Sequence, residues 1–195
     1  MAAEMEFVIG ATASCSDAPC GEVSRMIIDP ASRTVTHLVI EPKHRRQNGR
    51  LVSLDLVDTT AGDIRLRCTL AEFDTLDPAE EVELVEGISS LGVGSMPAPG
   101  GIPEAVPTVV ENVVPPGETE VGRDEHVHAL DGEIGQVAGF RVDPGDHRVT
   151  HVLLREGHFW GRKEVAIPVS AVTGVENGIR LSMTKKQIED LPPAH

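Results

Sequence analysis

Two histidines in the second half of the chain have the spacing of metal ligands. His126 and His128 alternate along an expected strand, so both project from the same face. Asp124 and Glu125 directly precede them. A structural metal site needs three or four converging ligands, and the sequence places only these two histidines together. We therefore expect surface histidines here and no bound metal.

Another pair of histidines lies at matching positions of two similar segments. His37 and His151 each end a Val-Thr-His triplet on an expected strand. Histidine titrates near neutral pH, which suits a ligand or a pH sensor. The sequence offers no oriented partner that would hold either imidazole as a metal ligand. We therefore expect each histidine to bond a nearby turn and close its strand.

The cysteines indicate a reducing environment. Three cysteines, Cys15, Cys20 and Cys68, are an odd and small number, unlike that of a disulfide-stapled secreted domain. The first basic residue is Arg25, so no secretory signal can be drawn at the start of the chain. The expected location is the cytoplasm. Four residues separate Cys15 from Cys20, unlike a redox or zinc CxxC motif, so we expect half-buried thiols, with an incidental disulfide as the alternative.

Signatures of known enzyme sites are missing from the sequence. It contains no Gly-x-Ser-x-Gly elbow, no P-loop and no His-Glu-x-x-His motif. The glycine-rich stretch 87–101 lacks the lysine of a P-loop. The charge-free run 87–103 contains three prolines and five glycines, which is incompatible with a helix that inserts into a membrane. We expect a protein without catalytic residues, cofactor or membrane insertion.

Residues 43–50, called the basic loop below, form a cluster of basic side chains on an otherwise acidic protein. Such a cluster suits an acidic protein partner or RNA, and the alternative is a solvated charge run. The residues assigned to partner binding are Lys43, Arg45, Arg46 and Arg50.

Residues 157–162, called the aromatic loop below, place two of the chain's few aromatic residues side by side. Tryptophan and arginine are over-represented among the energetic hot spots of interfaces. The alternative is that the rings fold back on the protein, because an apolar pair on a loop has to be covered. The residues assigned to partner binding are Phe159, Trp160 and Arg162.

The elements that position these residues are repeated along the chain. Residues 16–39 align without a gap with residues 130–153 at an offset of 114. The match resumes at an offset of 115, where 64–66 overlies 179–181. Two copies of one module therefore bracket a middle segment.

Each copy has the pattern of short strands closed by a short helix. An Asp-Pro turn joins the first two strands of each copy, as in a type I turn. A Thr-x-x-Glu or Thr-x-x-Gln capping box then starts a helix, at Thr69 and at Thr184, and prolines stop it. Many short strands at close spacing favour a small barrel or sandwich. The expected strands are 23–28, 35–41, 51–57 and 64–68 in the first copy and 137–142, 149–155, 164–169 and 179–183 in the second.

These residues resemble the PRC-barrel family. The resemblance rests on Gly-x-Val before an Asp-Pro turn, Val-Thr-His, a Gly-Arg loop, Val-Ala-Ile-Pro at 165–168 and a closing Thr-x-x-Gln helix that ends in Leu-Pro. The family includes the cytoplasmic part of the photosynthetic reaction-centre H subunit and the C-terminal domain of the ribosome maturation factor RimM. The resemblance implies a mainly β fold with two small barrels, 6–77 and 119–193, each closed by a C-terminal helix. It also implies a non-enzymatic module that docks on other macromolecules.

The segment between the copies, residues 78–118, differs in composition from both. Residues 68–122 hold eleven acidic residues and no basic one, whereas 1–67 hold 8 basic and 9 acidic, and 123–195 hold 9 and 11. We expect an irregular acidic linker rich in proline and glycine, whose valines at 109–114 either add an edge strand to a barrel or lie between the barrels.

Charge and composition narrow the function further. The formal charge of −14 argues against general affinity for nucleic acid or anionic membranes, although the two copies themselves are nearly neutral. We expect a bacterial-type cytoplasmic scaffolding protein that docks on a protein partner, with homo-oligomerisation as an option. One rival is an RNA-binding or ribosome-assembly factor that uses the basic loop. The other is a metal or redox protein that uses Cys15, Cys20, His126 and His128.

Overall fold

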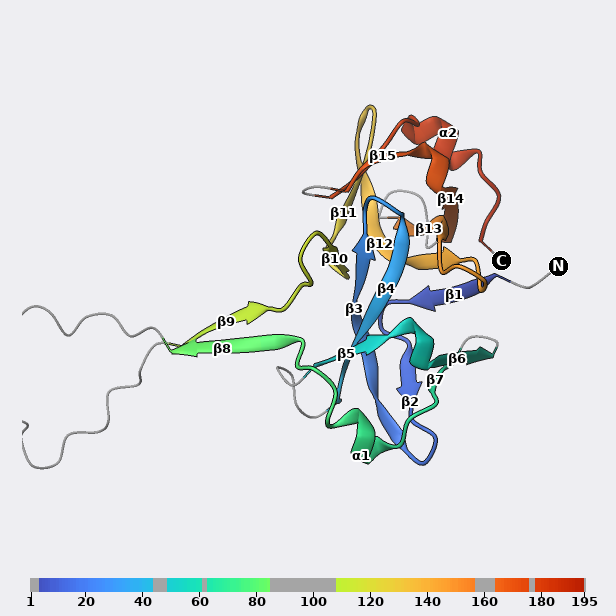
Figure 1. Ribbon diagram of the computed structural model, residues 1–195. Helices are drawn as coiled ribbons and strands as arrows, with labels where there is room; N and C mark the ends of the chain where they lie inside the picture. The colour runs from blue at the N-terminus through green and yellow to red at the C-terminus, as the bar shows by residue number, and fades with distance from the viewer. Residues whose placement is uncertain are drawn as a thin grey trace, which may run out of the picture.

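The protein is built mainly from β-strands, as the sequence predicts. The computed structural model describes residues 4–43, 49–60, 63–84, 108–156, 164–175 and 178–194. Their strands form two seven-stranded sheets and one separate two-stranded ladder (Figure 1). Among the described residues, no helix is long and apolar enough to cross a membrane.

The first sheet consists mostly of the first copy and has the order β5-β4-β3-β2-β7-β6. β4 occupies one edge of the long strand β3, while β2 and a strand from the second copy, β10, share the other edge. β2 and β7 pair in parallel. The strands are β2 (Thr12–Ser14), β3 (Pro19–Asp29), β4 (Thr34–Glu41), β5 (Arg50–Ser53), β6 (Val57–Thr60), β7 (Asp63–Leu66) and β10 (Thr119–Gly122).

The second sheet repeats this plan with the second copy, in the order β14-β13-β12-β11-β16-β15. β13 lies on one edge of β12, and β11 and β1 share the other. β11 and β16 form the parallel pair. The strands are β1 (Met5–Val8), β11 (His126–Ala129), β12 (Gly132–Val142), β13 (Val149–Glu156), β14 (Glu164–Pro168), β15 (Val172–Gly174) and β16 (Ile179–Leu181).

The two copies exchange their first strands. β1 is the first strand of the first copy but pairs with β12 of the second, with Met5 opposite Val142. β10 is the first strand of the second copy but pairs with β3 of the first, with Thr119 opposite Ile28. Both residues of the second ladder lie 114 positions from their counterparts in the first, so the exchange is reciprocal. Neither of the two large sheets is therefore completed by strands of its own copy alone.

After β1 the chain passes from the second copy to the first within a single peptide unit. The amide of Ile9 donates to the carbonyl of Ala138 at 2.8 Å, whereas the next amide, of Gly10, donates to Val23 at 2.7 Å. Consecutive residues thus bind different copies. Gly10 has φ +92°, a conformation that side-chain-bearing residues rarely adopt, so glycine suits this reversal.

Glycines also allow the exchanged strands to approach. A Cβ atom at Gly139 would lie 2.0 Å from the carbonyl oxygen of Phe7. The matching position of the first copy is Arg25, and there the glycine is on the exchanged strand instead, since Gly122 lies opposite Arg25. Each ladder therefore has one residue without a side chain at this point.

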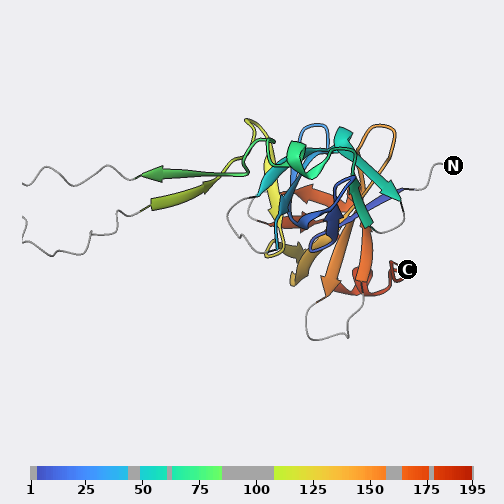
Figure 2. The ribbon, with the colours of Figure 1, turned by 90° about the horizontal axis from the view of Figure 1, so that it is seen from below.

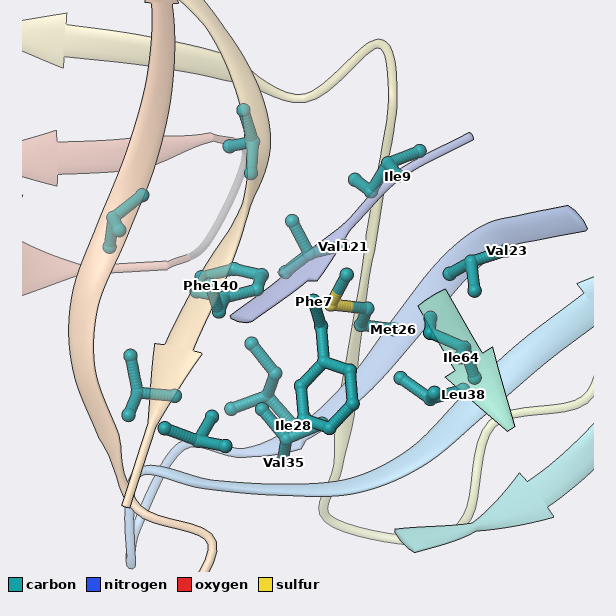
Figure 3. Close-up of a cluster of buried hydrophobic side chains, with 14 of the residues drawn as sticks. Phe7, Ile9, Val23, Met26, Ile28, Val35, Leu38, Ile64, Val121 and Phe140 are labelled. Carbon is teal, nitrogen blue, oxygen red and sulfur yellow. The ribbon is translucent and has the colours of Figure 1, made fainter. Parts of the chain in front are cut away.

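A hydrophobic core runs through both sheets without a break. Successive side chains of a strand point to opposite faces of the sheet, and the inward-facing ones include the buried Phe7 on β1 and Val121 on β10. Figure 3 shows these two side chains beside Met26, Ile28 and Phe140, which come from β3 and β12. Full burial of a side chain of this size stabilises the fold by about 1.5–3 kcal/mol. The core therefore holds the two copies together.

Both predicted capping boxes form. Thr69 accepts from the amide of Glu72 at the start of α1 (Leu70–Phe73), and Thr184 accepts from Gln187 at the start of α2 (Lys185–Glu189). An aspartate from the turn before the long strand of each copy adds a further bond: Asp17 accepts from the first amide of α1, and Asp131 does so for α2. The helices are thereby tied to the sheets.

Two expectations about local structure need correction. The predicted strand 51–57 is interrupted by a 3-10 turn at Leu54–Leu56, which separates β5 from β6. In the middle segment, β8 (Glu80–Leu84) and β9 (Thr108–Asn112) pair with each other and not with the edge of either large sheet. This pair, called the arm below, extends away from both sheets in two views (Figures 1 and 2). Beyond β9, Val114 does pack against the first copy, beside Ile27, Val39 and Ala79.

Candidate functional site

The described part of the basic loop is bound to its own protein. Lys43 lies 3.1 Å from a carboxylate oxygen of Glu22. Arg50, on β5, donates to the carbonyl of Leu76 at 3.1 Å, just after α1. Arg45 and Arg46 lie outside the described residues. The roles of these four cations in partner binding stay predictions.

The aromatic loop lies outside the described residues, including Phe159, Trp160 and Arg162. The strands that flank it are described: Arg155 on β13 and Glu164 on β14 face each other in the ladder with their charged groups 4.0 Å apart. The same two strand ends in the first copy flank the basic loop, because β4 and β5 are the counterparts of β13 and β14. The two loops thus connect equivalent strands.

The matched histidines face carboxylates that immediately precede the exchanged strands. His37 Nδ1 lies 3.9 Å from Glu118, which immediately precedes β10. His151 Nδ1 lies 3.8 Å from Glu4, which immediately precedes β1. Each imidazole also contacts the threonine before it, at 3.0 and 3.1 Å. The expected contact with a turn is therefore replaced by a contact that joins the two copies.

In the other histidine pair, His126 has a carboxylate neighbour. His126 Nδ1 lies 2.7 Å from Glu133, and both side chains are about half exposed. The His126 and His128 rings are 6.5 Å apart. Within the described residues, no group of three or more His, Cys, Asp or Glu side chains is arranged to hold a metal ion.

The three cysteines are free thiols buried in the first copy. Burial raises the pKa of the Cys15 thiol, and its neighbours Cys20 and Cys68 raise it further. Burial also raises the pKa of the Cys20 thiol. A thiol with a raised pKa is a poor nucleophile and a poor metal ligand at neutral pH. At the positions of Cys15 and Cys68 the second copy has Ala129 and Met183, so this is a site of apolar packing.

A partly buried ion pair anchors the base of the arm. Arg25 on β3 lies 3.1 Å from Glu80 at the start of β8 and 3.2 Å from Glu120 on the exchanged strand β10. Asn112, at the end of β9, donates to Glu120 at 2.9 Å. Burial raises the pKa of the Glu80 carboxyl even though Arg25 lowers it. The direction of the arm is thereby fixed relative to the first sheet.

A pocket opens where the two copies meet, and sequence reasoning did not find it. Its volume is about 630 Å³. Ile28, Pro30 and Arg33 of the first copy form one side, and Arg180 lies among the residues of the second copy. The sequence signal for the pocket is a set of differences in side-chain size between matching positions of the two copies. These differences can be interpreted only when the strand exchange is known.

Comparison with models of protein families and with curated proteins finds no match for this chain. The assignment of its function therefore rests on its own residues.

Proposed function

We propose that this chain is a non-enzymatic interaction protein that docks on a protein partner through the basic loop and the aromatic loop. In this proposal each seven-stranded sheet, with its helix, is a PRC-barrel-like module completed by one strand of the other copy. The observation that carries the proposal is the reciprocal exchange of β1 and β10.

The exchange supports docking because it fixes the two modules relative to each other. The continuous core and the two exchanged ladders join the modules directly through their described strands. The strand ends that flank the two loops are thereby held at a set separation. A preorganised pair of contact points loses less entropy on binding than two independent ones.

The two loops also differ in chemistry in a way that suits one partner. Cations of the basic loop favour a partner with an acidic face and accelerate the encounter. The Phe159-Trp160 pair offers apolar anchors of the kind that dominate binding energy at the centre of an interface. We infer that the partner carries an acidic surface beside an apolar pocket.

The test is a capture experiment on cell extract with paired variants of the full chain. Trp160→Ala and Arg45→Glu remove the proposed contacts. Leu130→Ala is the control for the first, because Leu130 is 68% exposed, and Lys186→Glu, on the exposed face of α2, is the control for the second. We expect a partner that is retained by the wild type and both controls and lost by both loop variants. If no protein's recovery depends on either loop variant, the proposal is wrong.

Binding of RNA by the basic loop is measured in parallel. Two of its four cations, Lys43 and Arg50, already contact groups of this chain. We therefore expect weak affinity for RNA even at low salt. Tight binding that weakens steeply with salt would instead identify phosphate contacts and favour the RNA-binding rival.

A further inference from the structure

The pocket between the copies has apolar walls and a cationic rim. Its volume of about 630 Å³ is within the range of small-molecule sites. Buried side chains form part of the wall, among them Phe140 on β12, Val152 on β13 and Ile179 on β16. Two arginines, Arg33 and Arg180, line it as well.

Three positions of the lining carry smaller side chains than the matching positions of the other copy. Thr119 lies where the other ladder has Met5, since both face the end of the long strand of the opposite copy. Val152 replaces Leu38, which is fully buried in the first copy. Val169, which begins the 3-10 turn of the second copy, replaces Leu54. Each of these three replacements removes carbon atoms from the wall.

Among the described residues, the charged side chains of the lining are of one sign. These residues include Arg33 and Arg180 but no aspartate or glutamate, although acidic residues greatly outnumber basic ones in the chain. Both arginine side chains are exposed. Among the described residues, neither guanidinium forms an ion pair or hydrogen bond with a side chain of this protein. Two unpaired guanidiniums beside apolar walls complement a ligand with a carboxylate at one end.

We propose that this pocket binds an elongated aliphatic carboxylate, of the class of medium-chain fatty acids. The alkyl chain lies against Phe140, Val152 and Ile179, and the carboxylate meets Arg33 and Arg180. Because Arg33 comes from the first copy and Arg180 from the second, the site exists only when the copies are assembled. The proposal is independent of docking through the two loops.

Isothermal titration of the full chain with decanoate, below its micelle concentration, tests the proposal. We expect saturable binding of one decanoate per chain. Decanol and decyltrimethylammonium, which have similar alkyl chains without the negative charge, should bind at least tenfold more weakly. Equal affinity for decanol would overturn the carboxylate assignment, and the absence of saturable binding would overturn the site.

Variants locate the site. Arg33→Ala and Arg180→Ala should each weaken decanoate binding about tenfold, since a charge-assisted hydrogen bond is lost. Arg65→Ala is the matched control, because Arg65 is the exposed counterpart of Arg180 in the first copy, and it should change the affinity less than twofold. Thr119→Met, which places the side chain of the other ladder in the pocket, should weaken binding at least tenfold while the circular dichroism spectrum stays that of the wild type. If decanoate binds the Arg33→Ala/Arg180→Ala double variant as tightly as the wild type, the proposal is wrong.

Discussion

Thr34 and Arg148 hold the same position in the two copies and pair with each other as an antiparallel β-bridge. The neighbouring hydrogen bonds are equivalent to each other: the amide of Val35 donates to the carbonyl of His147 at 3.1 Å, and the amide of Val149 donates to the carbonyl of Arg33 at 2.8 Å. A contact between equivalent residues lies on a two-fold axis, as at the centre of a symmetric dimer. The exchange of β1 and β10 follows the same axis. The chain is therefore arranged as a strand-exchanged dimer within one polypeptide.

Gly139 tests the close approach of β1. In Gly139→Ala the new Cβ would meet the carbonyl oxygen of Phe7 at 2.0 Å, so β1 has to shift away from β12. We expect the free energy of unfolding to fall by about 3 kcal/mol, as measured by urea denaturation. Gly174→Ala, in β15, is the control because no atom lies within 4 Å of its added Cβ. Equal stability of the two variants would contradict the tight ladder.

Cleavage of the chain between the copies tests whether they form one unit. A protease site inserted after Gly94 separates the part with β1–β8 from the part with β9–β16. Each part supplies a strand to a sheet of the other, so we expect the cleaved protein to elute from a sizing column as one species of the original mass. Denaturant should be needed to separate the parts. Separate elution of two folded parts under native conditions would show that the modules are independent.

Glu80 gives the stability a dependence on pH. Burial raises the pKa of its carboxyl above the ordinary value of 4.5, so the folded chain holds the proton more tightly than the unfolded chain does. The free energy of unfolding therefore falls as pH rises from 4.5 through the raised pKa.

Replacement of Glu80 by glutamine should remove this contribution. Denaturation at a series of pH values should show a flatter profile for Glu80→Gln than for the wild type, whatever the absolute stability of the variant. Glu81→Gln changes the exposed neighbour and should keep the wild-type profile. Parallel profiles for Glu80→Gln and the wild type would exclude Glu80 as the source.

The two capping boxes should contribute alike. Thr69→Ala and Thr184→Ala each remove the hydroxyl that accepts from the third amide of its helix. A lost N-cap of this kind costs about 1 kcal/mol in the free energy of unfolding. Lys186→Ala alters the exposed face of α2 without touching the cap, and we expect it to change the stability by less than about 0.5 kcal/mol. A cap variant as stable as Lys186→Ala would mean that the box is not needed.

Local features were predictable because their causes are local. The Asp-Pro turns, with Asp29 accepting from the amide of Ala31, follow from short-range hydrogen bonding that the residue types specify. The same holds for the capping boxes. The internal repeat supplied the second copy of each feature. The mainly β architecture follows from the alternation of these short segments.

The exchange could not be predicted in this way. Strand β1 alternates in the same manner whether it pairs with β3 or with β12, so the pattern of burial does not choose between them. One signal was available, since Glu4 and Glu6 match Glu118 and Glu120 at the offset of 114, which marks the missing strands. The pocket and the His37–Glu118 contact depend on the exchange, and they were missed for the same reason.

The pairing of β1 is measured most directly by nuclear Overhauser effects between backbone protons of the isotope-labelled full chain. The structure predicts cross-peaks that connect Phe7 with Phe140 and Val121 with Met26, the opposed residues of the two exchanged ladders. Backbone cross-peaks that instead connect Phe7 with Met26 and Val121 with Phe140 would show that each copy keeps its own first strand, and would contradict the exchange.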